Sequence, residues 1–109
     1  MNEKEVAGRG IRYSLEEQGR EIGHAYLYLL SNDLHEEPFG LLEDVQIDEG
    51  HRGQGAANSL VKAVIERAQH EGCYKLIATS RNDGTRQTVH DWYLRLGFRD
   101  YGSEFRLDF

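Results

Sequence analysis

Hydrophobic and polar residues alternate near the start of the chain. From Gly10, three apolar residues fall on one side of an extended backbone, with polar residues between them: Ile11, Tyr13 and Leu15. This period of two predicts a half-buried strand. Gln18-Gly19 then marks a turn, and apolar positions resume over residues 21–30. The two runs predict an antiparallel hairpin.

A third apolar run covers residues 39–47, after a polar loop at 31–38. It is apolar on both faces, which is typical of a central strand. Glu43 and Asp44 interrupt it. By strand alternation, Glu43 should share a face with Leu41, Val45 and Ile47, and Asp44 should point to the opposite face.

The next segment changes to helical spacing. Apolar residues recur over 56–68 at intervals that build one face of a helix, and Gly72 stands where helices favour a C-terminal glycine. A short apolar strand follows at 74–79. A strand, a helix and a strand in this order predict a right-handed crossover and a parallel strand pair.

A second helix is expected near the C-terminus. Thr85 suits its N-cap, and the helix should end before Gly97. Two short final strands are expected at 98–101 and 104–109. The order is β, β, β, α, β, α, β, β, which predicts an α/β fold with a mixed central sheet and two main helices.

Length and charge limit the number of domains and the kinds of partner that the chain could have. The 109 residues suit a single domain, 1–109, with residues 1–9 as a loose polar end. The net charge of −6 argues against a nucleic-acid partner, since phosphate backbones require a basic face. No apolar run is long enough to span a membrane. The single Cys73 fits a reducing cytosol, so a cytoplasmic location is expected.

The turn between the third strand and the first helix is the strongest chemical signal. It reads Arg52-Gly53-Gln54-Gly55-Ala56-Ala57. A glycine turn at a helix start leaves backbone N–H groups without partners, and the helix dipole adds positive potential. Such a site suits a phosphate or pyrophosphate. The alternative is that the turn only joins a strand to a helix.

Two stretches of the chain resemble the GNAT superfamily of acyl-CoA-dependent N-acetyltransferases. The first, Val45 to Ala57, is similar to the family's coenzyme A motif, with Arg52, Gly55 and Ala57 at the motif positions. The second is Trp92-Tyr93-Leu94-Arg95-Leu96-Gly97-Phe98, which resembles the family's later Tyr and Gly-Phe motif. The resemblance covers roughly residues 10–102.

This resemblance implies a site for acetyl-CoA as co-substrate, without a metal. The third and fourth strands would splay apart and admit the coenzyme. Its pantetheine arm would pair with Val45, Gln46 and Ile47. Its pyrophosphate would lie on backbone amides of the turn and the first helix: Arg52, Gly53, Gln54, Gly55, Ala56, Ala57 and Asn58.

Two departures from the family pattern are visible. The usual N-terminal strand and two helices are lacking. The chain therefore resembles a short member whose acceptor side is either open or completed by another subunit, as in a homodimer. The family often carries an asparagine about two helical turns before the tyrosine. Arg86 occupies that region here, and Asn82 lies further back.

The resemblance also suggests catalytic residues for acetyl transfer to a primary amine by direct attack. Tyr93 is the candidate acid that protonates the leaving thiolate; packing as a core aromatic is the alternative. Glu43 is the candidate base, because a carboxylate among apolar neighbours needs a partner or a task. Asp44 is the weaker candidate, and either carboxylate could instead pair with an arginine. The backbone N–H of Val45 would donate to the oxyanion.

Other functions remain open at this point. The domain could be a non-catalytic module that senses acetyl-CoA. A nucleotide-phosphate protein is a further alternative, although the turn lacks the Lys-Ser/Thr ending of a P-loop. The acceptor could be a small amine, an amino sugar, a polyamine or a protein amine. The five histidines show no metal-ligand spacing: His24, His35, His51, His70 and His90.

Overall fold

The hairpin expected at the start of the chain is present and is longer than the apolar pattern alone required. A computed structural model describes residues 1–81 and 83–109. Strand β1 spans Arg9–Glu17 and strand β2 spans Arg20–Leu30, and they pair antiparallel. Gln18 and Gly19 form the turn between them, both with positive φ. Residues 1–8 form neither helix nor strand.

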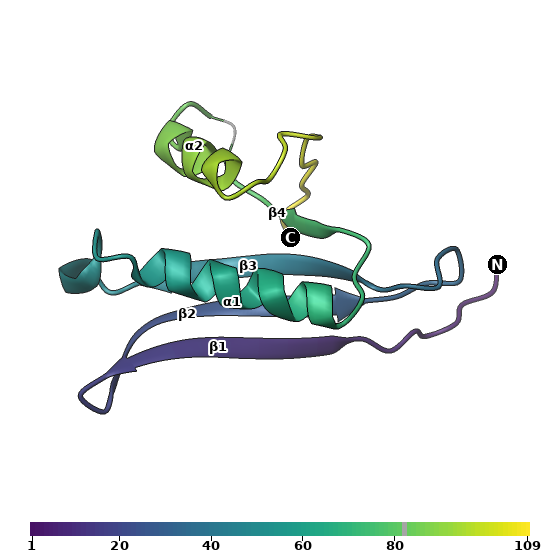
Figure 1. The fold of residues 1–109 in the computed structure, drawn as a ribbon. Coiled ribbons are helices and arrows are strands. Elements are labelled where there is room, and N and C mark those ends of the chain that lie inside the picture. Colours follow the sequence, from purple (N-terminus) through teal and green to yellow (C-terminus); the bar gives the residue numbers. More distant parts are fainter. Residues whose placement is uncertain (82) are drawn as a thin grey trace. The chain divides into compact units, whose positions relative to one another are not determined.

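The other two strands complete a mixed sheet. Strand β3, Phe39–Ile47, pairs antiparallel with β2, and strand β4, Leu76–Ala78, pairs parallel with β3. The sheet order is β1-β2-β3-β4 (Figure 1). The central position of β3 and the parallel crossover to β4 are confirmed.

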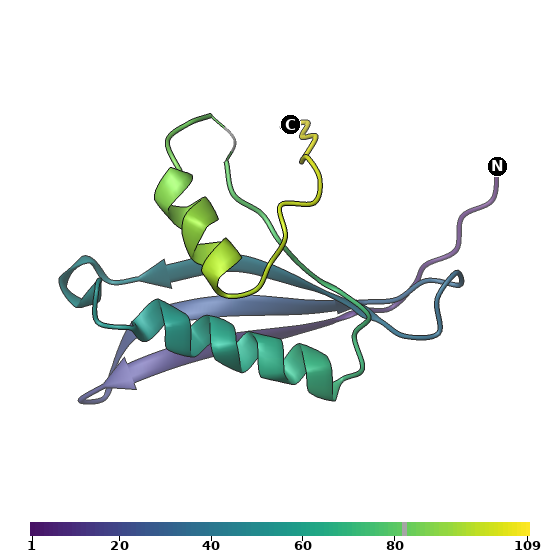
Figure 2. The same ribbon diagram turned by 45° about the horizontal axis from the view of Figure 1, so that its top comes forward.

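Helix α1, Ala56–His70, lies across one face of β1, β2 and β3 (Figure 2). Gly72, with a φ of 77°, follows the end of α1. Gly72 N–H donates to Gln69 at 3.0 Å and Cys73 N–H donates to Ala68 at 3.0 Å, which is the Schellman pattern. The core is formed by alternate residues of the strands and by the apolar stripe of α1: Ala25, Leu27, Leu29, Leu42, Leu60, Val61, Val64 and Ala68.

These elements belong to the first of two compact units, Met1–Ala78 and Thr79–Phe109. The second unit holds helix α2, Gln87–Arg95. Its N-cap is Arg86, so the expectation of Thr85 was wrong by one residue. The N–H and the hydroxyl of Thr85 both donate to the Asp83 carboxylate, and this local turn engages the group that would otherwise cap the helix.

The two final strands expected at 98–101 and 104–109 are not formed, so that prediction was wrong. An alternating pattern makes a strand only where a neighbouring strand completes the hydrogen-bond ladder. No strand of the described chain pairs with this segment. Its large apolar side chains stay exposed: Tyr101, Phe105, Leu107 and Phe109.

The fold class is nevertheless confirmed as α/β, and the described residues form a four-stranded mixed sheet and two α-helices. Within the described residues, no helix combines the length and the apolar character needed to cross a membrane. Asn82 lies outside the described residues.

Candidate functional site

A β-bulge interrupts β3 where the sequence placed its two acidic residues. Tyr26 lies opposite Glu43, whereas His24 lies opposite Gln46. Asp44 and Val45 therefore share the space opposite one residue of β2. Asp44 has a φ of +51°, a left-handed conformation that few residues other than glycine adopt, although Asp is among the more tolerant. The extra residue bends the strand and leaves its ladder locally unpaired.

The bulge changes which side chains share a face. Directly opposed residues in an antiparallel pair point the same way. Ile47 lies opposite Gly23, and a Cβ added at Gly23 would be 2.6 Å from Ile47 Cδ1 and 3.5 Å from Leu60 Cδ1. Ile47 therefore faces α1. Glu43 lies opposite Tyr26, on the other face.

The expectation that Glu43 shares a face with Ile47 was therefore wrong, because strict alternation does not hold across a bulge. Its grouping with Leu41 was correct, since Leu41 lies opposite Tyr28 on the same side of the sheet as Tyr26. Glu43 is half-buried and makes an interaction within the protein. Asp44 is exposed at the bulge.

Three aromatic side chains of β2 lie on the same face of the sheet as Glu43. The rings of Tyr26 and Tyr28 stack with centroids 6.1 Å apart, and His24 meets Tyr26 edge-on at 5.9 Å. We call His24, Tyr26 and Tyr28 the aromatic strip. Arg12 donates to the Tyr26 hydroxyl at 3.1 Å and pairs with Glu21. The hydrogen bond from Arg12 holds the pKa of Glu21 below its ordinary value.

Beyond Leu42, β3 runs on without a neighbour on the β4 side. The parallel pairing covers only three residue pairs, from Gly40 with Leu76 to Leu42 with Ala78. The rest of β3, from Glu43 to Ile47, has no strand partner on that side among the described residues. An extended ligand that carries amide groups can pair with such a strand edge. Val45, Gln46 and Ile47 lie on this edge.

The glycine turn has the geometry expected of an anion site. Gly53 and Gly55 have φ values of 78° and 81°, so both positions favour glycine. A Cβ added at either would meet no atom within 4 Å, so the space in front of the turn is open. Gly55 caps α1, with no side chain bonded to the first turn of the helix.

Backbone donors point out of this turn. Among the described residues, no backbone oxygen accepts the N–H groups of Gly53, Gln54, Gly55, Ala56 or Ala57. Asn58, also in the first turn of α1, has a partner within the protein. A cluster of unpaired N–H groups at the positive end of a helix dipole attracts a phosphate or pyrophosphate.

Arg52 joins the turn to the strand edge. Its Nε donates to the carbonyl oxygen of Ile47 at 3.2 Å. The guanidinium therefore lies between the end of β3 and the start of α1, and places a fixed positive charge between the two parts of the candidate site. Beside it, His51 Nε2 is 3.1 Å from a Glu17 oxygen.

Tyr93 lies in the second unit, on the last turns of α2. Phe98 N–H donates to Tyr93 O and Gly97 N–H donates to Leu94 O, both at 3.1 Å, and Gly97 has a φ of 102°. This is a Schellman motif, and its usual hydrophobic contact is the Tyr93–Phe98 ring pair at 5.3 Å. The ring of Trp92 is also close to that of Tyr93, with centroids 5.0 Å apart. The Gly97-Phe98 part of the sequence motif thus fixes the end of the helix and the ring of Tyr93.

Other reactive side chains lie apart from these features. Burial is the main cause that raises the pKa of the Cys73 thiol, which suits an inert thiol. In residues 1–81 and 83–109, no three His, Cys, Asp or Glu side chains are grouped so that they could hold a metal ion.

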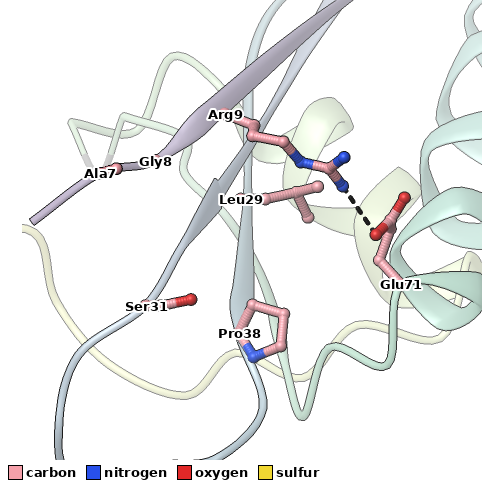
Figure 3. A pocket seen from close by; sticks show the side chains of 7 residues that line it. All are labelled: Ala7, Gly8, Arg9, Leu29, Ser31, Pro38 and Glu71. Carbon is pink, nitrogen blue, oxygen red and sulfur yellow. Dashed lines mark ion pairs between the residues drawn. The ribbon is translucent and has the colours of Figure 1, made fainter.

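A shallow cavity of about 200 Å³ lies beside the C-terminal end of α1 (Figure 3). Figure 3 shows the Arg9 side chain reaching the Glu71 carboxylate, at 2.7 Å. Glu71 also pairs with Arg67 at 2.9 Å. Because the two charged residues that line it, Arg9 and Glu71, already pair with each other, this cavity is a weaker candidate than the turn.

One feature of the site was missed by pattern reasoning: the bulge at Asp44. The available signal was the acidic pair Glu43-Asp44 inside an apolar strand, which was interpreted only as possible chemistry. Asp is enriched at positive φ, so the same pair also indicated a backbone irregularity.

The chain is similar to proteins of known family and known structure. A family model described as the acetyltransferase (GNAT) family matches residues 2–98. A glucosamine 6-phosphate N-acetyltransferase of Trypanosoma brucei brucei is 35% identical over 69 residues, which is 63% of this chain and 44% of that protein. Glucosamine 6-phosphate N-acetyltransferase 1 of rice, Oryza sativa subsp. japonica, is 31% identical over 70 residues, 64% of this chain and 39% of that protein. The chain thus spans less than half the length of these relatives.

Solved structures show the same fold. A Trypanosoma brucei acetyltransferase matches with a TM-score of 0.84 and 29% identity, over 92% of this chain and 69% of the other. A protein described as a putative acetyltransferase from Agrobacterium tumefaciens matches with a TM-score of 0.83 and 25% identity, over 91% and 68% of the two chains.

Proposed function

Since this chain belongs to the acetyltransferase (GNAT) family, we propose that it moves an acetyl group from acetyl-CoA to a primary amine by direct attack. The observation that carries the proposal is the pairing of two binding features in the first unit. An unpaired strand edge from Glu43 to Ile47 leads into a turn with free N–H groups at the start of α1. The edge suits the amides of pantetheine, and the turn suits a pyrophosphate.

Acetyl transfer to an amine places three demands on the protein. The amine must be neutral to attack, the oxyanion needs a donor, and the thiolate leaves best when it is protonated. We assign the base to Glu43, acting directly or through water, and the acid to Tyr93. The bulge at Asp44 disrupts the ladder beside Val45, and we assign the oxyanion donor to the Val45 N–H.

The acceptor is proposed to be a small primary amine. Glu43 and the aromatic strip lie on one face of the sheet. A carboxylate and the faces of tyrosine rings both attract an ammonium group. The names of the relatives make an amino-sugar phosphate the first acceptor to test. A polyamine or a protein amine would use the same carboxylate.

Coenzyme binding can be tested by calorimetry with acetyl-CoA on the wild type and on Gly55→Glu. The variant places a negative side chain in the open space before the turn, where it repels a pyrophosphate. We expect the affinity for acetyl-CoA to fall by about ten- to hundred-fold, because hydrogen bonds to a charged group are lost.

The matched control is Gly19→Glu. Gly19 has a similar φ of 76° and open space around it, so the substitution brings the same strain and the same charge at the hairpin turn instead. Its affinity for acetyl-CoA should equal that of the wild type. Equal weakening in both variants, or none in either, would remove the turn from the coenzyme site.

A non-catalytic acetyl-CoA sensor is the second candidate, because the strand edge and the turn would bind acetyl-CoA whether or not transfer follows. Incubation of the chain with acetyl-CoA and a panel of amines distinguishes the enzyme from the sensor. Release of free coenzyme A that depends on the amine supports the enzyme. Tight binding without transfer to any amine supports the sensor.

A further inference from the structure

The N–H groups that would bind the pyrophosphate do not fix the turn that carries them. Those of Gly53, Gln54 and Gly55 donate to no backbone oxygen of the described residues. Gly53 and Gly55 also have left-handed φ values, and glycine loses more conformational freedom on ordering than any other residue. The position of the turn must therefore be fixed by the segments on either side of it, which are α1 and residues 48–52.

A short 3₁₀ helix, Glu49–His51, precedes the turn. Asp48 N–H donates to the carbonyl oxygen of Ile22 at 2.8 Å, which extends the β2–β3 ladder by one hydrogen bond. Arg52 N–H, at the other end of this segment, is 3.4 Å from Glu49 O. That distance is long for a hydrogen bond from an N–H group. The backbone therefore holds this segment firmly at its strand end and only weakly at the end that leads into the turn.

Two side-chain contacts join this segment to the end of the first hairpin, and both segments lie at the same end of the sheet (Figure 2). His51 Nε2 is 3.1 Å from a carboxylate oxygen of Glu17, the last residue of β1. Arg20, the first residue of β2, is 3.4 Å from Asp48. The His51 side chain is 29% exposed, whereas that of Arg20 is 76% exposed. Because exposed ion pairs contribute little, the His51–Glu17 contact is the stronger of the two.

The space between the hairpin end and His51 is mostly polar. A cavity of about 280 Å³ lies there, and Ile22 is the one apolar residue among those that line it: Glu17, Gln18, Arg20, Ile22 and His51. Where two segments bury little apolar surface between them, their relative position depends on directional polar contacts. The His51–Glu17 contact is therefore well placed to fix the 3₁₀ helix.

The two nitrogens of His51 have different surroundings. Nε2 must carry a hydrogen in order to donate to Glu17. Nδ1 is buried and has no hydrogen-bond partner among the described residues. The ring therefore contacts the hairpin through Nε2 alone, and a substitution that keeps a donor at this position should keep the contact.

We propose that His51 and Glu17 form a positioning pair for the coenzyme site. The pair holds the 3₁₀ helix against the hairpin, and thereby keeps the N–H groups of the turn directed at the pyrophosphate before the coenzyme arrives. A site that is already ordered loses less conformational entropy on binding, which raises affinity. This inference rests on the coenzyme role proposed for the turn, and extends that role to a residue of β1 that lies outside both the turn and the strand edge.

Replacement of His51 by each of two amides tests the pair. Glutamine is long enough to bring its NH₂ group near the position of Nε2, where it donates to Glu17, whereas asparagine reaches only as far as Nδ1. We expect the dissociation constant of acetyl-CoA, measured by calorimetry, to be about five-fold higher for His51→Asn and close to the wild-type value for His51→Gln. The controls are His70→Asn and His70→Gln, at an exposed position of α1, and both should bind like the wild type.

A double-mutant cycle tests whether the effect of His51 passes through Glu17. Glu17→Ala removes the acceptor from an exposed position and should weaken binding as much as His51→Asn does. The double variant should bind no more weakly than either single variant, because all three lack the same contact. For each variant, kcat at saturating acetyl-CoA should stay within about two-fold of the wild type, since the pair acts on binding alone. Additive losses, or equal losses in His51→Asn and His51→Gln, would overturn the pair.

NMR relaxation of the backbone amides, without coenzyme, gives a second readout. The order parameters of the Gly53 and Gly55 N–H groups should fall in His51→Asn and be retained in His51→Gln. Unchanged order in both variants would overturn the pair, whatever the affinity for acetyl-CoA. A wild type that binds no acetyl-CoA would instead overturn the proposed function, together with the coenzyme role of the pair. The order parameters would still decide whether the hairpin holds the turn, so the two failures are distinguishable.

Discussion

Asp44 adopts a left-handed backbone conformation inside β3, with a φ of +51°. The bulge at this residue shifts the alternation of the strand by one position. Ile47 consequently packs against Gly23 and Leu60 rather than pointing to the opposite face. The same shift leaves Glu43 on the face of the aromatic strip.

Replacing Asp44 by valine should destabilise the fold. A β-branched residue is poorly suited to positive φ, and the left-handed region costs ordinary residues about 1 to 2 kcal/mol. We expect the free energy of unfolding in urea to fall by about that amount. Asp44→Gly should be neutral or stabilising, and Gln46→Val, at an exposed position of the same strand, should have little effect. Equal losses in all three would mean that the backbone conformation at Asp44 is not strained.

The Tyr93→Phe substitution removes the hydroxyl of Tyr93 and retains its ring. Tyr93→Phe keeps the contacts with Phe98 and Trp92, so the end of α2 should be unchanged. If Tyr93 is the acid, kcat should fall by about 10²-fold, the lower range for a positioned acid, with acetyl-CoA affinity within two-fold of the wild type as an order-of-magnitude expectation. Steady-state kinetics and calorimetry measure the two quantities. Unchanged turnover would leave Tyr93 with a packing role alone.

At the scale of elements, an ion-pair cluster connects the start of β1 to the end of α1. Glu71 follows the helix and receives Arg9 from the strand at 2.7 Å and Arg67 from the helix at 2.9 Å (Figure 3). The hydrogen bond from Arg9, followed by that from Arg67, holds the pKa of Glu71 below its ordinary value. The cluster ties the edge strand to the helix that covers it.

This cluster should make stability depend on pH. A carboxyl whose pKa is lower in the folded state stabilises the fold above its unfolded pKa, about 4.3 for Glu, and this contribution is lost as pH falls through the folded pKa. Glu71→Gln should therefore be less stable than the wild type at neutral pH and nearly equal to it near pH 3. Urea unfolding at both pH values measures the difference. Glu66→Gln, exposed on α1, is the control, and a Glu71→Gln deficit that persists unchanged at low pH would contradict the ion-pair origin.

At the scale of the whole molecule, the family match covers residues 2–98 and so extends over both compact units. The strand edge, the turn and Glu43 belong to the first unit, and Tyr93 belongs to the second. The proposed coenzyme-binding features are therefore contained in the first unit, whereas one of the two proposed catalytic side chains belongs to each unit.

The sequence was sufficient to predict the elements whose patterns are local. The hairpin, β3, α1 with Gly72 at its end, and α2 each follow from periodicity and capping within about fifteen residues. The sequence also located the glycine turn, because positive φ at Gly53 and Gly55 is a local property.

Features that depend on a distant partner were beyond such patterns. Residues 104–109 alternate like a strand, but strand formation requires a neighbouring strand, which a local pattern does not reveal. The face of the sheet on which Ile47 lies depends on the bulge in β3, and pairing with β2 fixes the position of that bulge. The site residues themselves remain predictions, since the proposed roles of Glu43 and Tyr93 require a bound substrate to be tested.

The helix end at Gly97 and Phe98 bears on how such proteins are recognised from sequence. The N–H groups of Gly97 and Phe98 donate to the last carbonyl groups of α2, and the ring of Phe98 packs against that of Tyr93. A phenylalanine at residue 93 would keep this ring pair. A signature built on Gly97 and Phe98 identifies an architecture, whereas the proposed acid chemistry would depend on the phenolic oxygen of Tyr93. Inactive homologues should therefore be hard to distinguish from active enzymes by this motif alone. Whether residue 93 carries a hydroxyl would be the first feature to inspect.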